Sequence, residues 1–299
     1  MERSTLAWFR AADPDLSNAL DDTALLIAQL RERHRVDVIT ASTAHDFVWR
    51  HFRTPYDLCV YELRDDKAHR FIPPYLVHYP GIVVLRGRPR GAPGILQSAR
   101  LIVTPHSAAV EPLQDECPNA RVRFAPAGIR EPSSASDVVA DLDWPLNGNA
   151  LTTALAAMSA GKTVIAFESE ETADWPALNP QTWKPRHFPG VGDRGTGPGG
   201  PAEPILVSID PRDEAHSVKL AMRRLSTDAA LRERLGAAAR EWWTTHATVG
   251  HAVKAWEGII AEALTLPPLA PSAERSAPDE ATGRAREILA EFGVRVDLF

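Results

Sequence analysis

The polar residues best spaced for binding chemistry lie at the start of a predicted helix over residues 150–160. They are Asn147, Gly148, Asn149, Thr152 and Thr153. Asn147 or Asn149 can serve as the N-cap of this helix. The same side chains, together with the free backbone N–H groups of a first helical turn, can instead hold a phosphate or a sugar. The sequence therefore predicts either a capped helix or an anion site at this position.

A second group of polar residues follows predicted strands in the first half of the chain. It consists of Asp15, Ser17, Asp65, His69 and Arg86. Asp15 or Ser17 can cap a helix whose apolar positions repeat with helical spacing up to Leu30, and Asp65 can cap the next polar helix. For His69 the alternatives are a surface or half-buried helix histidine and a residue that faces a ligand.

Two glycine patterns match nucleotide-binding motifs only in part. Residues 156–163 fit a relaxed phosphate-loop pattern, but they close a predicted helix and open a strand, whereas a phosphate loop does the reverse. Gly161 as the residue that ends the helix explains this segment better. Residues 190–195 read G-x-G-x-x-G without a preceding strand, within a Gly- and Pro-rich stretch over 186–204, and predict a loop.

Composition excludes several classes of protein. The net charge of −6 argues against a nucleic-acid-binding surface, and the apolar runs are far shorter than a membrane span requires. None of the ten histidines forms a zinc motif, so we expect neither a metal nor a cofactor. Cys59 and Cys117 are expected to be buried thiols. Together with the absence of a secretory pattern before the first strand, they predict a cytoplasmic protein.

Short Val/Ile/Leu-rich runs alternate with helical patterns and predict an α/β fold with parallel sheets covered on both faces. The first six runs belong to residues 1–128 and predict one complete doubly wound, Rossmann-like domain. Residues 129–264 contain fewer such runs and predict a second, truncated domain of the same kind. A Pro-rich linker over 265–280 then leads to a docking helix within 281–299, whose apolar positions are Ile288, Leu289 and Phe292.

Four segments, in the same order, resemble those of group-1 (family-4, GT-B type) glycosyltransferases. They are residues 57–85 with the strand end His78-Tyr79-Pro80-Gly81-Ile82-Val83-Val84-Leu85, residues 99–129, the helix and strand Ala154–Ile165, and the helix Asp228–Ala239. The resemblance extends over most of residues 1–264. It implies two Rossmann-like domains facing across a cleft, and transfer of a sugar from a nucleotide-sugar donor to a glycan or other acceptor with retained configuration.

The resemblance also implies roles for the two polar groups. The donor, whose pyrophosphate leaving group needs basic side chains and a helix N-terminus, would lie at Asn147–Thr153. The acceptor would lie on the side of Asp15, Ser17, Asp65, His69 and Arg86. His69 matches a histidine on a helix of the family.

Several working residues of the family are replaced in this chain. The paired glutamates of the E-x7-E motif fall on Gly148 and Ala156, the His–Asp after the "VVL" strand becomes Arg86-Gly87, and a later histidine becomes Ala127. A stretch that carries basic residues for the diphosphate is missing between residues 129 and 144. The alternative to an active transferase is therefore a non-catalytic binding or partner protein with the same fold. The short second domain leaves open whether its sheet is completed in a homo-oligomer.

Overall fold

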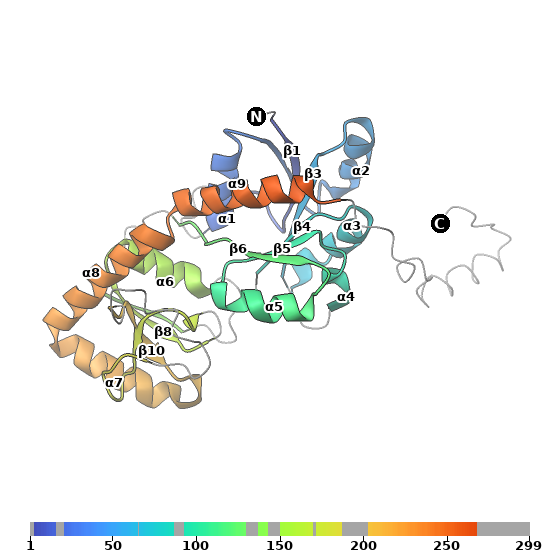
Figure 1. Cartoon of the computed structure of the whole chain (residues 1–299). Coiled ribbons are helices and arrows are strands. Elements are labelled where there is room, and N and C mark those ends of the chain that lie inside the picture. The colour runs from blue at the N-terminus through green and yellow to red at the C-terminus, as the bar shows by residue number, and fades with distance from the viewer. Residues whose placement is uncertain are drawn as a thin grey trace. The chain divides into compact units, whose positions relative to one another are not determined.

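The computed structural model describes residues 3–15, 21–64, 66–86, 93–129, 137–142, 150–169, 172–186 and 203–267 (Figure 1). Within these ranges the strands form two separate sheets, and every strand pair in both sheets is parallel. The predicted α/β class with two parallel sheets is thereby confirmed. The predicted helix within 281–299 and nearly all of the predicted linker lie outside the described residues.

The first sheet has six strands in the order β2-β1-β3-β4-β5-β6. They are β1 (Thr5–Phe9), β2 (Arg35–Ile39), β3 (Leu58–Leu63), β4 (Ile82–Leu85), β5 (Leu101–Thr104) and β6 (Arg121–Phe124). All residues of β3, β4 and β5 are buried, as expected for central strands with helices on both faces. The chain order reverses between β1 and β3, where sheets of this type commonly bind ligands.

Helices cover both faces of the first sheet. One face carries α2 (Ala44–Arg53), α3 (Ile72–His78), α4 (Pro93–Leu96) and α5 (Val110–Glu116), with short 3-10 turns η1 (Lys67–His69) and η2 (Ser107–Ala109). The other carries α1 (Asp22–Leu30) and α9 (Val249–Thr265). The apolar stripe of α9, which includes Ala252, Trp256 and Ile260, packs with Leu6 and Trp8 of the first sheet.

The packing of α9 differs from the sequence interpretation, which placed residues 129–264 together. The rings of Trp256 and Trp8 lie 4.9 Å apart between their centres, so α9 closes the hydrophobic core of the first sheet. Helical spacing predicted an apolar stripe on this helix, but spacing alone cannot say which sheet the stripe will cover.

The second sheet has four described strands in the order β7-β8-β10-β9. They are β7 (Val138–Asp141), β8 (Thr163–Phe167), β9 (Ala177–Leu178) and β10 (Leu206–Ile209). α6 (Ala150–Ser159) and the second half of α8 (Ala229–His246) pack on one face, while α7 (Glu214–Thr227) and the first half of α8 pack on the other. A 3-10 turn, η4 (Pro211–Asp213), precedes α7.

Gly161 ends α6 as predicted. Its φ is +68°, a left-handed conformation that glycine adopts without strain. A Cβ on Gly236 of α8 would lie 2.1 Å from the carbonyl oxygen of Gly161. The loop between α6 and β8 therefore contacts the backbone of α8 directly, and only glycine fits at position 236.

Three local features were not predicted from the sequence. The cap of α1 is Asp21, whose Oδ1 accepts from Ala24 N at 2.9 Å, and not Asp15 or Ser17. Pro73 and Pro74 lie in the first turn of α3, where a helix needs no N–H from these positions. The helix α2 was not predicted, although Ala44, Phe47 and Val48 have helical spacing.

Candidate functional site

The carboxyl edge of the first sheet holds a cluster of charged side chains around the reversal between β1 and β3. Its members, which we call the first-edge cluster, are Arg10, Asp21, Asp22, Glu62, Arg64, Arg86 and His106. They come from the ends of β1, β3 and β4, the segment after β5, and the start of α1. The parallel strands bring these distant positions together, because all carboxyl ends lie at one edge of the sheet.

Arg86 lies in the interior of the first-edge cluster and is 8% exposed. Its guanidinium donates to Asp22 Oδ2 at 2.8 Å and to the hydroxyl of Thr23. Burial opposes the charged form, but Asp22 and Glu62 outweigh it and raise the pKa of Arg86 above its ordinary value. The arginine that stands in place of the family's His–Asp pair is thus a strongly stabilised cation.

Glu62 connects the cluster to the hydrophobic core. Its Oε1 accepts from Trp8 Nε1 at 2.8 Å and lies 3.9 Å from Arg10 Nε. Arg10 also binds both carboxylate oxygens of Asp21, at 3.1 and 3.0 Å. Since Asp21 also caps α1, these contacts fix the start of that helix against the ends of β1 and β3.

Two further groups respond to the positive charge of Arg86. Burial and Arg86 lower the pKa of His106 to about 3, so this imidazole is neutral at physiological pH. Burial and Arg86 also lower the pKa of Arg64, against the opposing effect of nearby carboxylates. With three arginines and three carboxylates, the first-edge cluster balances its own charge. Such an arrangement positions structural elements and offers little unpaired charge to a ligand.

The carboxyl edge of the second sheet has a different character. At the end of β7, Asp141 Oδ2 accepts from Ala154 N in the first turns of α6 at 2.9 Å. Thr152 is buried and Thr153 is half-buried in the same turn. Asn147, Gly148 and Asn149 lie outside the described residues. A carboxylate therefore already binds one backbone amide at the predicted anion site.

Arg186 supplies a buried positive charge at this second edge, and its side chain is 7% exposed. Its guanidinium donates to Ser208 Oγ and, at 2.9 Å, to the carbonyl oxygen of Thr172, while Glu168 lies 3.9 Å away. Ser208 shares its side of β10 with Leu206, on the face that α6 covers. Burial lowers the pKa of Arg186 to about 10, against the opposing effect of Glu168.

The predicted acceptor-side residues occupy separate positions within the described ranges. Asp15 is exposed, and its backbone N donates to Asp21 at 3.3 Å. His69 is buried on η1, where its Nδ1 lies 2.7 Å from Asp66 Oδ1. Arg86 belongs to the first-edge cluster, whereas Ser17 and Asp65 lie outside the described residues. His69 and Arg86 share no hydrogen bond or ion pair within the described part of the chain.

Sequence reasoning missed the partners that define both edges. Glu62 and Asp22 lie inside regular elements that read as apolar, and Arg186 stands at the beginning of a Gly- and Pro-rich stretch that predicts only a loop. The sequence contained one signal for such a partner. Glu62 is a charged residue within a continuous apolar strand, and a buried charge of this kind requires a partner.

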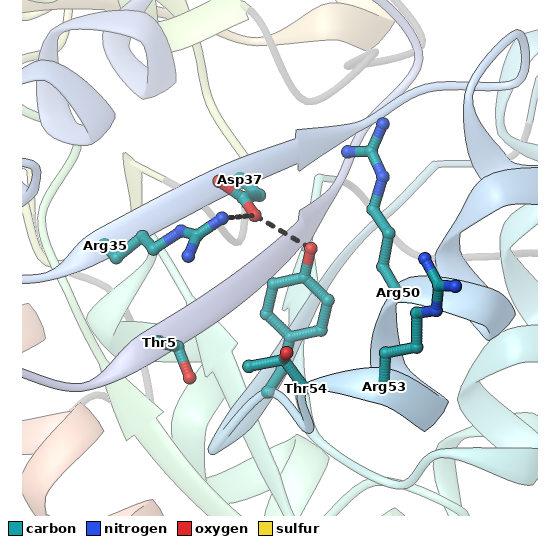
Figure 2. A pocket seen from close by; sticks show the side chains of 7 residues that line it. Thr5, Arg35, Asp37, Arg50, Arg53 and Thr54 are labelled. Atoms are coloured by element: carbon teal, nitrogen blue, oxygen red, sulfur yellow. Dashed lines mark hydrogen bonds and ion pairs between the residues drawn. The ribbon is translucent and has the colours of Figure 1, made fainter.

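A concave pocket of about 330 Å³ lies at the opposite, amino edge of the first sheet (Figure 2). Its lining residues are Thr5, Arg35, Asp37, Arg50, Arg53, Thr54 and Tyr56. Tyr56 donates to Asp37 Oδ2 at 2.8 Å, and burial together with Asp37 raises the pKa of this phenol to about 12. The pocket is well formed, but parallel sheets bind their substrates at the other edge, so we do not assign it to the transfer chemistry.

Among the described residues, no helix is long and apolar enough to cross a membrane. The same residues contain no group of three or more His, Cys, Asp or Glu side chains placed to hold a metal ion. Cys59 and Cys117 are free and buried, as predicted.

Comparisons with known proteins find little. No protein-family model matches the chain, and no curated protein matches it. Among solved structures, the crystal structure of CalG4, the calicheamicin glycosyltransferase, is similar over 88% of this chain and 99% of that chain, with 13% identity and a TM-score of 0.39. A similarity this low carries no argument about function.

Proposed function

We propose that this protein is a glycosyltransferase-like protein that binds a nucleotide-sugar donor at the carboxyl edge of the second sheet and transfers the sugar to an acceptor. The observation that carries the proposal is the buried guanidinium of Arg186, which donates to Ser208 Oγ on the α6 side of that edge. The four sequence segments that resemble group-1 glycosyltransferases support it, as does the presence of two all-parallel sheets.

The diphosphate of the donor would lie between the start of α6 and Arg186. Backbone N–H groups at a helix N-terminus favour negative charge, and a buried guanidinium acts on it through a medium of low polarity. Negative charge grows on the diphosphate as the sugar leaves, so the same groups would stabilise the transition state. No metal is needed for this role.

A second candidate function is non-catalytic binding of the same donor. Ala156, where the family has a glutamate, is 5% exposed and packs in the core of the second sheet. It offers no hydrogen bond to a sugar hydroxyl. The first-edge cluster, on the acceptor side, is also balanced internally. These two observations are the grounds for keeping the non-catalytic binding or partner protein as the second candidate.

Calorimetric titration with nucleoside diphosphates and nucleotide sugars tests donor binding. Replacing Arg186 with Gln is expected to weaken binding about tenfold or more, since hydrogen bonds and ion pairs to charged groups contribute roughly 1.5–3 kcal/mol. The matched control is Arg212→Gln, because Arg212 is 88% exposed and pairs with Asp210. Equal loss in both variants, or no binding at millimolar ligand, would contradict the proposal.

Turnover separates the two candidate functions. Release of nucleoside diphosphate from a bound nucleotide sugar, in the presence of candidate acceptors, indicates a transferase. Binding without any release above the uncatalysed rate indicates the non-catalytic protein. Both measurements use the full chain, and the Arg186→Gln variant provides the background for each.

A further inference from the structure

The solvent face of α2 exposes an unusual amount of apolar surface. Phe52 is 81% exposed, Trp49 is 72% exposed and Val48 is 44% exposed. The opposite side of the same helix is fully engaged, because Ala44 and Phe47 are buried in the core of the first sheet. The exposed row, which we call the aromatic face, therefore contributes nothing to the described core and leaves large apolar side chains in water.

Arginines lie directly beside the aromatic face. Arg53 follows Trp49 by one helical turn, and Arg50 lies one turn before Arg53. Figure 2 shows these two side chains next to each other on α2, with Arg35 on β2 at the other side of the pocket. Guanidinium groups of three arginines thus line one pocket of about 330 Å³, a size that admits a phosphate group.

Acidic groups compensate this charge only in part. Asp37 lies 3.4 Å from Arg35 and accepts from Tyr56. Asp46 lies 3.8 Å from Arg50, in a pair whose two side chains are each 51% exposed. Within the described ranges Arg53 makes no ion pair. Surface pairs of this kind are weak, so an external anion can compete for both Arg35 and Arg50.

The aromatic face and the neighbouring arginines together indicate which kind of partner binds to α2. A second copy of the chain would bring the same arginines against themselves, and like charges oppose such a dimer. Aromatic side chains beside arginines on one short, strongly amphipathic helix are typical of helices that lie in the interface of a bilayer. The chain as a whole carries a net charge of −6, so attraction to an anionic surface must come from a local feature such as this one.

We propose that α2 docks the protein onto an anionic phospholipid bilayer. Trp49 and Phe52 enter the boundary between head groups and acyl chains, and lipid phosphates bind in the pocket of Arg35, Arg50 and Arg53. This attachment is peripheral and reversible. It is independent of the proposed function, because the pocket lies at the amino edge of the first sheet and the proposed donor site at the carboxyl edge of the second.

Sedimentation with sucrose-loaded vesicles tests the proposal. Vesicles with about 30% phosphatidylserine should bind the full chain, pure phosphatidylcholine vesicles should not, and raising the salt concentration should weaken binding. Each arginine near an anionic surface contributes about fivefold to affinity, so Arg50→Gln with Arg53→Gln should lower it tenfold or more. Trp49→Ser with Phe52→Ser should abolish it.

The control is a pair of apolar residues of lesser exposure on other elements, Phe124→Ser with Met222→Ser, which are 43% and 44% exposed in the wild type. This variant should bind as the wild type does. Equal loss in the control variant, binding to phosphatidylcholine alone, or no vesicle binding at low salt would overturn the proposal. Concentration-dependent self-association that disappears with Trp49→Ser would also overturn it, in favour of a protein interface.

Discussion

The carboxyl edges of the two sheets carry buried arginines in opposite electrostatic situations. In the first sheet, Asp22 and Glu62 raise the pKa of Arg86 above its ordinary value. In the second, burial lowers the pKa of Arg186 to about 10, and Glu168 at 3.9 Å restores only part of the lost solvation. Both arginines are buried, but carboxylates outweigh the effect of burial on the pKa of Arg86, whereas burial outweighs the effect of Glu168 on the pKa of Arg186.

This difference shows why a charged residue at a sheet edge is not by itself a sign of function. The general rule for parallel sheets places ligands at both carboxyl edges equally. The balance of charge distinguishes the two edges, because a cluster that neutralises itself must break its own ion pairs before it binds a charged ligand. We therefore assign a structural role to the first-edge cluster, and the proposed anion site lies at the second edge.

The largest expected effect comes from breaking the first-edge cluster. Arg86→Gln leaves Asp22 buried without its ion-pair partner and removes a positive charge near Glu62, and removing one partner of a buried pair typically costs about 3–5 kcal/mol. Urea denaturation should show a loss of this size in the free energy of unfolding. A loss below about 1 kcal/mol would mean that the cluster is not structural. Arg234→Gln, on the exposed surface of α8, should change stability by less than about 0.5 kcal/mol.

The second expected effect concerns the framework of the second sheet. Gly236→Ala places a Cβ against the carbonyl of Gly161, and overpacking of this kind costs about 1–3 kcal/mol. Gly258→Ala is the matched control on α9, where a Cβ meets no atom within 4 Å. It should stabilise the protein by up to about 1 kcal/mol, since alanine favours helices over glycine. Thermal unfolding of both variants measures the difference. A shift of the melting temperature with the same sign in both would contradict the close contact between Gly236 and Gly161.

The third prediction concerns the pH dependence of stability that His106 gives to the first-edge cluster. The pKa of His106 is about 3 in the folded state, well below the ordinary histidine value of about 6.5. The unfolded chain therefore binds the proton more readily, and this group makes stability fall as pH drops below about 6.5. Between pH 7 and pH 5 the loss should be roughly 2 kcal/mol. His106→Gln should remove that part of the pH dependence, while His246→Gln, at an exposed position on α8, should leave it unchanged. A wild type whose stability is flat over this range would contradict the burial of a neutral imidazole.

The smallest expected effect tests the second edge. Asp141→Asn keeps a group that can accept from Ala154 N but removes a negative charge from the start of α6. If a diphosphate binds there, its affinity should rise about two- to fivefold, because charge at a helix N-terminus is worth about 0.3–1 kcal/mol. Asp210→Asn, at the end of β10, serves as the control. Unchanged or weaker affinity for the nucleoside diphosphate in Asp141→Asn would place the ligand elsewhere.

The sequence predicts the architecture better than the site. Parallel strands such as β3 and β8 read as apolar runs because helices bury both of their faces, and Gly161 was recognisable because only glycine suits a left-handed helix end. The same reasoning missed α2 and could not tell that Trp49 and Phe52 on its apolar side are exposed, because spacing does not show which apolar residues a core will cover.

Contacts between distant residues were beyond sequence reasoning. Arg86 and Asp22 are 64 residues apart, and Arg186 and Ser208 are 22 apart, so spacing along the chain carries no sign of either pair. The choice of sheet for α9 was also hidden, because an apolar stripe fits either sheet. Charge balance at an edge depends on all of these contacts together.

Amide hydrogen exchange with and without a saturating nucleotide sugar tests the central comparison most directly. Our account predicts that the ligand slows exchange at the start of α6 and in residues 168–186, and leaves residues 10, 21–23, 62–64 and 86 unchanged. Protection confined to the first-edge cluster, or no protection at either edge, would contradict it.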